Sequence, residues 1–183
     1  MPIVRRFCGL FLIGALLSLP ALGQRRVGVE EADFFDKSDL VFVGELVDQE
    51  SDWDDDHRLI LTRHVFRVED SIKGEPGGLV EITEYGGVVG NIEMNLSHST
   101  RYAVGREYLV FSYQDAERRN RTLHGPLGQF QILSDRSGER VVRMYPTHPL
   151  AAFLGDGAVI FRQLEAFSSS LREALASRSF SRD

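Results

Sequence analysis

Histidine side chains can act in catalysis and bind metal ions, and this sequence has five: His57, His64, His98, His124 and His148. None of them is spaced like the ligand pairs of a zinc site, such as His-x-His or His-Glu-x-x-His. A zinc site would therefore need histidines from distant segments to converge. His64 lies in a predicted strand, where we expect a half-buried, hydrogen-bonded side chain.

The segment Ser97-His98-Ser99 places a candidate nucleophile beside a candidate base. A serine hydrolase of the α/β class carries its nucleophile in a Gly-x-Ser-x-Gly turn, and this sequence has no such motif. Adjacent residues of a strand also point to opposite faces, so these side chains would not meet. We therefore predict no catalytic residues and no enzymatic activity.

Acidic residues alternate in the segment DWDDDH at residues 52–57, as they do at the start of a calcium-binding loop. Such a loop continues with a glycine and has a glutamate at its twelfth position, whereas this sequence has His57 and Arg63 there. The alternatives are a loose calcium contact and a solvated turn, and the turn is favoured. We predict no metal site and no cofactor.

Three glycines, Gly86, Gly87 and Gly90, lie in the segment ITEYGGVVGNIEMN at residues 82–95. A phosphate-binding loop needs GxxxxGK followed by Ser or Thr, and a dinucleotide-binding loop needs GxGxxG before a helix. The spacing here fits neither, and the segment continues into residues 92–94, which read as a strand. Because glycine adopts positive φ angles without a Cβ clash, we interpret the segment as a bend between strands.

The elements that must position these residues are mostly strands. Alternating apolar residues and flanking turn sequences predict strands at 40–47, 58–68, 79–84, 107–113, 129–133 and 139–144. Both faces of the 107–113 strand are apolar or aromatic, which indicates burial on both sides. Gly44 predicts a bulge or sharp bend in the first strand.

Loops and a helix complete the predicted elements. We expect an acidic loop at 48–57 and a solvated hairpin loop around the basic cluster at 117–121. From Asp156 onward, apolar residues at three- and four-residue steps predict an amphipathic helix with Asp156 as its N-cap. Those apolar residues are Ile160, Leu164, Phe167, Leu171 and Leu175.

The N-terminus has the three-part layout of a secretory signal peptide. Arg5 and Arg6 precede the 13 apolar residues 7–19, and small residues follow up to Gly23. Thirteen helical residues span ~20 Å, which is short of the ~30 Å hydrocarbon core of a bilayer. We therefore expect cleavage near Gly23 and a secreted or periplasmic bacterial protein, exported by the general or the twin-arginine route.

Charge and cysteine content limit the functions further. The chain has a formal net charge of −6, and removal of Arg5 and Arg6 with the signal peptide would leave 19 basic against 27 acidic residues, or −8. An acidic surface repels phosphate backbones, so nucleic acid is excluded as a partner. The only cysteine, Cys8, lies in the signal peptide, so the mature chain must rely on a buried core rather than disulfides.

Several strand sequences occur in an order that resembles a known group of proteins. The segments are SDLVFVGELV at 38–47, FRV at 66–68, SIKG at 71–74, VEI at 80–82, YAVGREYLVF at 102–111 and GQFQI at 128–132. Their order is similar to the OB-fold barrel of the tissue-inhibitor-of-metalloproteinase and netrin-like group. It is also similar to uncharacterised secreted bacterial proteins that share a Gly-Gly-x-x-Gly segment followed by YLVF-like and GxFxI-like strands.

This resemblance covers residues 38–144 and implies an all-β fold with one C-terminal helix, built as a small, five-stranded, OB-like Greek-key β-barrel. The expected domain organisation is a signal peptide at 1–23, an N-terminal lead-in at 24–37 and the barrel at 38–146. A linker and the C-terminal amphipathic helix are expected at 147–183.

The resemblance does not imply that this chain has the inhibitory site of those proteins. The inhibitors place a cysteine at the mature N-terminus to chelate the zinc of their target, whereas this chain offers Gln24. The main prediction is an exported, non-enzymatic binding module; the alternative is a protease inhibitor-like domain without that cysteine. The expected partner is an extracytoplasmic protein, either a protease or an envelope component, with no nucleic acid and no stable membrane anchor after cleavage.

Ligands of OB-type barrels bind on one strand face and its flanking loops, so we expect contact residues in three loops. They are Trp53, Tyr85, Gly86, Gly87, Asn91, His98 and Tyr102. Trp53 is the only tryptophan and has two readings, an exposed aromatic contact or a side chain folded back over the barrel.

Overall fold

The structure is a computed structural model that describes residues 31–143, residue 150 and residues 161–179. The predicted signal peptide at 1–23, Asp156 and Ile160 lie outside the described residues. Within the described residues, no helix combines the length and the apolar character needed to cross a membrane.

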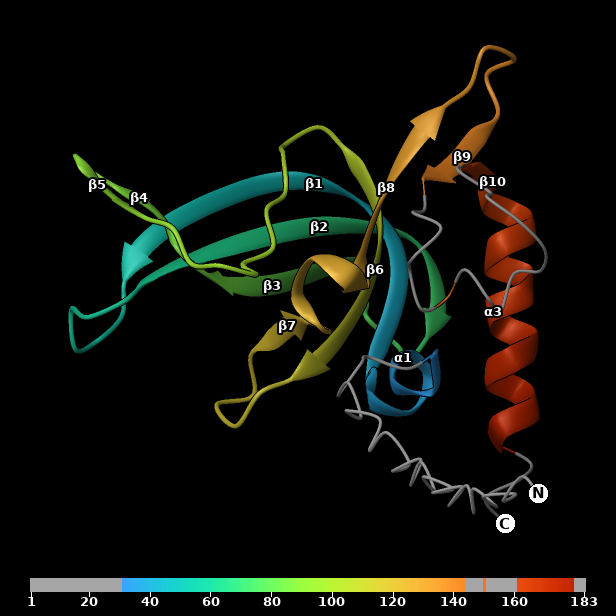
Figure 1. Cartoon of the computed structure of the whole chain (residues 1–183), viewed down its shortest axis with the longest axis horizontal. Helices are drawn as coiled ribbons and strands as arrows, with labels where there is room; N and C mark the ends of the chain where they lie inside the picture. The colour runs from blue at the N-terminus through green and yellow to red at the C-terminus, as the bar shows by residue number, and fades with distance from the viewer. Residues whose placement is uncertain (1–30, 144–149, 151–160, 180–183) are drawn as a thin grey trace, which may run out of the picture.

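The described chain is an antiparallel β-structure with one short helix before it and one longer helix after it (Figure 1). This confirms the predicted all-β class with a C-terminal helix. The elements are α1 (Glu31–Lys37), β1 (Leu40–Trp53), β2 (Ile60–Lys73), β3 (Leu79–Tyr85), β4 (Gly87–Val89), β5 (Ile92–Met94), β6 (Glu107–Gln114), β7 (Asn120–Thr122), the 3-10 helix η1 (Gly125–Gly128), β8 (Gln129–Ser134), β9 (Arg140–Arg143), β10 (Phe161–Gln163) and α3 (Leu164–Ser179).

The strand order of the main sheet is β10-β9-β8-β6-β1-β2-β3, with β7 paired to β6, while β4 and β5 form a separate hairpin. Three consecutive strands, β1 to β3, are followed by β6, which returns beside β1; this is the predicted Greek-key order. The predicted closed barrel is wrong, because β3 pairs with β2 alone among the described strands. The sheet is open and strongly curved (Figure 1).

Bulges account for the curvature of the two longest strands. The pairing of β1 with β2 shifts register at three places, one of them between Val43 and Gly44. A Cβ on Gly44 would lie 2.7 Å from the backbone oxygen of Arg67, so only glycine fits there. The predicted bulge at Gly44 is confirmed, but β1 continues to Trp53, so the expected acidic loop at 48–57 shrinks to a turn after it.

Two apolar cores lie on opposite sides of β1 and β6, since alternate side chains of a strand point to opposite faces. The inner core, inside the curve of the sheet, contains Phe42, Leu46, Phe66, Val80, Ile82, Tyr102, Tyr108 and Val110. The helix-side core, which includes α1 and α3, contains Phe34, Phe35, Val41, Val43, Leu109, Phe111, Leu123, Phe130, Ile132, Val142, Leu150, Leu164, Phe167 and Leu171. The prediction that 107–113 is buried on both faces is confirmed.

Both helices form polar contacts with the long strand β2. The Lys73 ammonium donates hydrogen bonds to the backbone oxygens of Phe35 at 2.8 Å and Ser38 at 2.5 Å, at the end of α1. Arg172 of α3 forms an ion pair with Asp70 at 2.6 Å. The helix begins at Leu164, later than predicted, because residues 161–163 pair with β9 as strand β10.

Candidate functional site

The glycine segment forms the predicted bend, which folds the β4–β5 hairpin back over the ends of β1 and β2. Gly86 and Gly87 have φ angles of 94° and 139°, in the region that favours glycine. A Cβ on Gly86 would lie 2.7 Å from the backbone oxygen of Met94, and one on Gly87 would collide with the hydroxyls of Ser51 and Thr62. The two glycines therefore allow a close approach as well as a turn.

A bulge determines which polar side chains of β1 face the inside of the sheet. Register shifts after Leu46, and pairing resumes as Gln49 with His64 and Ser51 with Thr62. Because directly opposed residues of antiparallel strands share a face, the extra residue turns Gln49 and Ser51 toward the inside. Without it, the same side chains would point outward.

These inward-facing side chains line a pocket of about 480 Å³ at one end of the curved sheet. This volume is within the range of small-molecule sites. Its walls come from β1, β2, β3, the β4–β5 hairpin and the loop at 95–102. The β4–β5 hairpin, which contributes to this lining, lies on the opposite side of the molecule from α3 (Figure 1).

The base of the pocket is the aromatic part of the inner core. The β2 side chains that face the inside of the sheet are Phe66, His64 and Thr62, in this order toward the pocket opening. The ring of Tyr102 packs edge-on against Phe66, with centroids 4.9 Å apart, and against His64, with centroids 5.0 Å apart. Polar groups thus begin where the apolar core ends.

Two buried polar atoms at this pocket have no hydrogen-bond partner within the described part of the chain. They are Nδ1 of His64, a residue 4% exposed, and Oγ1 of Thr100, a residue 2% exposed. His64 is thus fully buried rather than half-buried as predicted, and its Nδ1 lacks a hydrogen-bond partner among the residues that the structure describes. Buried polar groups in proteins are normally paired, so these two atoms are exceptions that cost stability.

Burial shifts the pKa values of three pocket-lining residues, His64, Glu84 and Tyr102, in favour of their neutral forms. Burial lowers the pKa of His64 from its usual 6.5 to about 4, so the imidazole is neutral at pH 7. Burial raises the pKa of Glu84, while hydrogen bonds from Thr122 and the charge of Arg121 oppose that rise. Burial also raises the pKa of Tyr102 well above its ordinary value.

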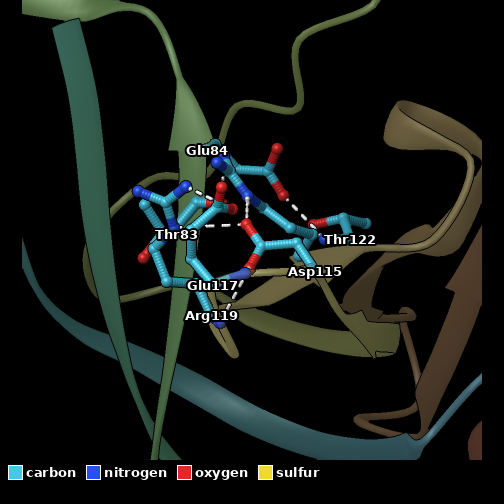
Figure 2. A network of polar contacts seen from close by, with 7 residues as sticks. Thr83, Glu84, Asp115, Glu117, Arg119 and Thr122 are labelled. Carbon is cyan, nitrogen blue, oxygen red and sulfur yellow. Dashed lines mark hydrogen bonds and ion pairs between the residues drawn. The ribbon is translucent and has the colours of Figure 1, made fainter. Parts of the chain in front are cut away.

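A hydrogen-bonded chain connects the wall of the pocket to β7. The amide of Thr122 donates to Oε1 of Glu84 at 2.8 Å (Figure 2), and the Thr122 hydroxyl lies 2.7 Å from the Tyr102 hydroxyl. Both pocket residues are therefore held in place by one threonine.

Arg121 supports the same wall from behind. Its Nη1 donates to the backbone oxygen of Thr83 at 3.0 Å, its Nε donates to Asp115 at 2.9 Å, and its guanidinium lies 3.9 Å from the ring centre of Tyr85. Desolvation raises the pKa of Asp115, but hydrogen bonds from Arg121 and Arg119 outweigh it and lower the pKa to about 2 (Figure 2). The predicted hairpin loop is confirmed between β6 and β7, where Glu117 and Arg118 are exposed, but Arg121 belongs to β7 and its side chain is only 4% exposed.

The structure brings together four of the seven predicted contact residues. Tyr85, Gly86, Gly87 and Tyr102 all line the pocket. Trp53 is half-buried and lies instead at a second hollow, of about 400 Å³, beside residues such as Leu61 and Arg119.

The other two predicted contact residues, Asn91 and His98, are exposed outside the pocket. His98 lies in a loop with a φ of 72°, not in a strand, while the neighbouring Ser99 hydroxyl donates to the backbone oxygen of Tyr85. Ser99 therefore contacts the pocket wall, whereas the neighbouring His98 lies outside the pocket.

The acidic segment at 52–57 forms a turn. Oδ1 of Asp54 accepts backbone hydrogen bonds from Arg58 at 2.7 Å and Leu59 at 3.0 Å, and the bond from Leu59 contributes most to lowering the Asp54 pKa. Among the residues that the structure describes, no group of three or more histidine, cysteine or acidic side chains is arranged to hold a metal ion.

Sequence reasoning missed the polar residues inside the pocket, namely Ser51, Thr62, His64, Glu84 and Thr100. A signal for three of them was present in the strand alternation. Thr62 and His64 share the parity of Phe66, and Glu84 shares the parity of Ile82, so they face the same interior.

Comparisons of the chain with protein-family models, with curated proteins and with solved structures gave no match.

Proposed function

We propose that the protein is a non-enzymatic binding module whose ligand occupies the pocket between the curved sheet and the β4–β5 hairpin. One observation carries this proposal: a pocket of about 480 Å³, a volume within the range of small-molecule sites, is lined by hydrogen-bonding side chains such as Gln49 and Ser51 at the end of the aromatic core.

Binding fits the geometry better than catalysis does. A general base works best with a pKa near the working pH, and burial has moved the pKa of His64 down to about 4. Two hydroxyls of the pocket, those of Ser51 and Thr62, lie 2.8 Å apart, and the Thr62 hydroxyl donates to the backbone oxygen of Gly86 at 2.5 Å. Neither hydroxyl is hydrogen-bonded to His64, so the pocket has no activated nucleophile of the serine–histidine kind.

The cellular compartment in which the ligand is met is also part of the proposal, and it is inferred from the N-terminal sequence pattern. A cleaved signal peptide at 1–23 would put the module in the periplasm or outside the cell, so its ligand or partner would be extracytoplasmic. The inhibitor-like alternative depends on the residues around Gln24, which lie outside the described part of the chain.

A fragment screen by two-dimensional NMR on the isotope-labelled protein tests this proposal. Binding polar fragments should shift the signals of His64 and Thr100 and raise the melting temperature. The variant Trp53→Ala should bind the same fragments with unchanged affinity, because Trp53 lies at the other hollow. Fragment hits that map to the Trp53 hollow, or a screen without hits in the pocket, would overturn the proposal.

A further inference from the structure

One edge of the sheet is open beside the pocket. β6 pairs with β1 only as far as Glu45. The backbone of Leu46 then forms hydrogen bonds with Gly105 and Arg106. Over residues 48–52, β1 pairs with β2 alone among the described strands, and most of its side chains there are exposed. A further strand has room to pair with β1 at this edge.

The alternation of hydrogen bonds in an antiparallel ladder identifies the backbone groups that face this edge. The amide of Gly86 donates to the backbone oxygen of Ile60 at 2.7 Å, on the side away from β1. Trp53, which is opposite Ile60, is therefore in a non-hydrogen-bonded pair, and so are the alternate residues Ser51 and Gln49. The N–H and C=O groups of Gln49 and Ser51 thus point outward, and none of the described residues bonds to them.

The two faces of an added strand would meet different surroundings. Its residues opposite Gln49 and Ser51 would share their face and point toward the pocket, which both of these side chains line. Its alternate residues would lie beside Asp48, Glu50 and Asp52 on the outer face, since successive side chains of a strand point to opposite faces.

The carboxylates of this outer face are only partly neutralised. Glu50 forms an ion pair with Arg63 at 2.6 Å. Asp48 and Asp52 form no ion pair with a described residue, and Asp52 accepts the amide hydrogen of its neighbour Trp53 at 2.7 Å. Two copies of β1 side by side would bring like charges together, which disfavours pairing of the protein with itself. The charges favour a strand that carries lysine or arginine.

We propose that the ligand is an extended segment of another protein, with lysine or arginine at alternate positions, which adds to β1 over residues 48–52 as a further strand. Its main chain bonds to Gln49 and Ser51, and the residues between the basic ones enter the pocket. Those residues are uncharged, because Arg101 and Glu93 of the pocket lie 4.0 Å apart and offset each other. The inference rests on the proposed function, since it names the class of partner for the same pocket.

Matched synthetic peptides test the charge and the strand pairing on the isotope-labelled protein. The probe is a peptide of about eight residues, long enough for one strand, in which lysine alternates with threonine and tyrosine. We expect a Kd below about 1 mM by NMR titration. Hydrogen exchange of the Gln49 and Ser51 amides should slow at least about tenfold in the complex. The same peptide with glutamate in place of lysine should bind at least about fivefold more weakly at low salt.

Backbone methylation separates strand pairing from attraction between charges alone. Two versions of the lysine peptide carry N-methyl groups on alternate amides, offset from each other by one residue. One version lacks the amide hydrogens directed at β1, and the other lacks those directed at solvent. Only the first should lose affinity, by about tenfold, since it can no longer donate to the edge. Equal affinity of the two versions would overturn the strand addition.

Variants of the protein test the same edge from the other side. Gln49→Pro removes an outward amide, at the kind of edge position where proline is tolerated, and should weaken the lysine peptide about tenfold. The matched control Gln49→Ala keeps the amide and should leave the affinity unchanged. If Gln49→Pro does not fold, the methylated peptides decide the question.

A second pair of variants tests the charges. Asp48→Asn combined with Asp52→Asn should weaken the lysine peptide about threefold to tenfold at low salt, and less at high salt. The control Glu165→Gln changes an exposed carboxylate on α3 and should leave the affinity unchanged. Equal effects of the double variant and the control would overturn the role of the acidic face.

The outcomes distinguish the partner class from the proposed function. If fragments bind in the pocket but no lysine peptide binds, the partner class is overturned and the binding function stands. If neither peptides nor fragments bind, both proposals fail. A lysine peptide that binds without slower exchange at Gln49 and Ser51, or a glutamate peptide of equal affinity, would also overturn the inference.

Discussion

Nη1 of Arg121 donates a 3.0 Å hydrogen bond to the backbone oxygen of Thr83 and so joins β7 to β3, two strands that share no ladder in the described sheet. The preceding residue, Asn120, reaches the backbone oxygen of Glu81 at 3.1 Å in the same way. Hydrogen bonds from side chains therefore connect β7 to β3 across the open edge of the sheet. The same contacts hold the wall of the proposed binding pocket.

The ion pair behind that wall should be important for stability. Asp115→Ala leaves the buried guanidinium of Arg121 without its carboxylate, and we expect a loss of about 3 kcal/mol in the free energy of unfolding. Urea denaturation followed by circular dichroism measures this loss. The matched control is Asp56→Ala, which removes an exposed ion pair to Arg58 and should cost less than about 1 kcal/mol. Similar small losses for both variants would contradict the assignment.

The buried histidine should make the protein less stable as the pH falls. The unfolded chain takes up a proton near pH 6.5, whereas folded His64 does so only near pH 4, so the unfolded state binds more protons between these values. The free energy of unfolding should fall by about 3 kcal/mol from pH 6.5 to pH 4. Denaturant titrations at several pH values measure the slope.

The variant His64→Phe removes this titration and should flatten most of the slope. A smaller slope should remain, because burial also lowers the pKa of His124. An unchanged slope in His64→Phe would show that another group titrates in this window.

The glycine bend should tolerate substitution at one position and not at another. Gly87→Ala forces an unfavourable φ of 139° and a collision with the Ser51 and Thr62 hydroxyls, so we expect a loss of at least about 2 kcal/mol. Gly90→Ala, at a φ of 59° with open space around it, should cost about 1 kcal/mol. Thermal unfolding ranks the two variants, and equal losses would mean that the close approach at Gly87 is unimportant.

Removing the buried, unpaired hydroxyl of Thr100 should stabilise the protein. Thr100→Val replaces a buried, unpartnered oxygen with a methyl group of similar size, and we expect a gain of about 1 kcal/mol in the free energy of unfolding. Thermal or denaturant unfolding of the variant measures this gain. A clear loss of stability in this variant would indicate a bond that the hydroxyl makes within the protein.

Local patterns were sufficient to predict most strands, the bulge at Gly44 and the glycine bend, because alternation and glycine conformation depend on neighbouring residues. The pocket depends on long-range pairing, and the sequence did not reveal it. Gln49 and Ser51 face inward only because the bulge after Leu46 shifts their register against β2. Arg121 looked like one member of a solvated basic cluster, but its partners Thr83 and Tyr85 lie far away in the chain.

The side-chain donors along β3 also bear on the behaviour of the protein at high concentration. Backbone oxygens on this strand accept from a side chain at three alternate positions: Glu81 from Asn120, Thr83 from Arg121 and Tyr85 from Ser99. A bare sheet edge acts as a template on which a strand of another molecule can add, the first step toward fibrils. A second copy of the protein would have to displace these side-chain donors before it could pair with β3. The donors therefore protect β3 against the addition of a strand from another molecule.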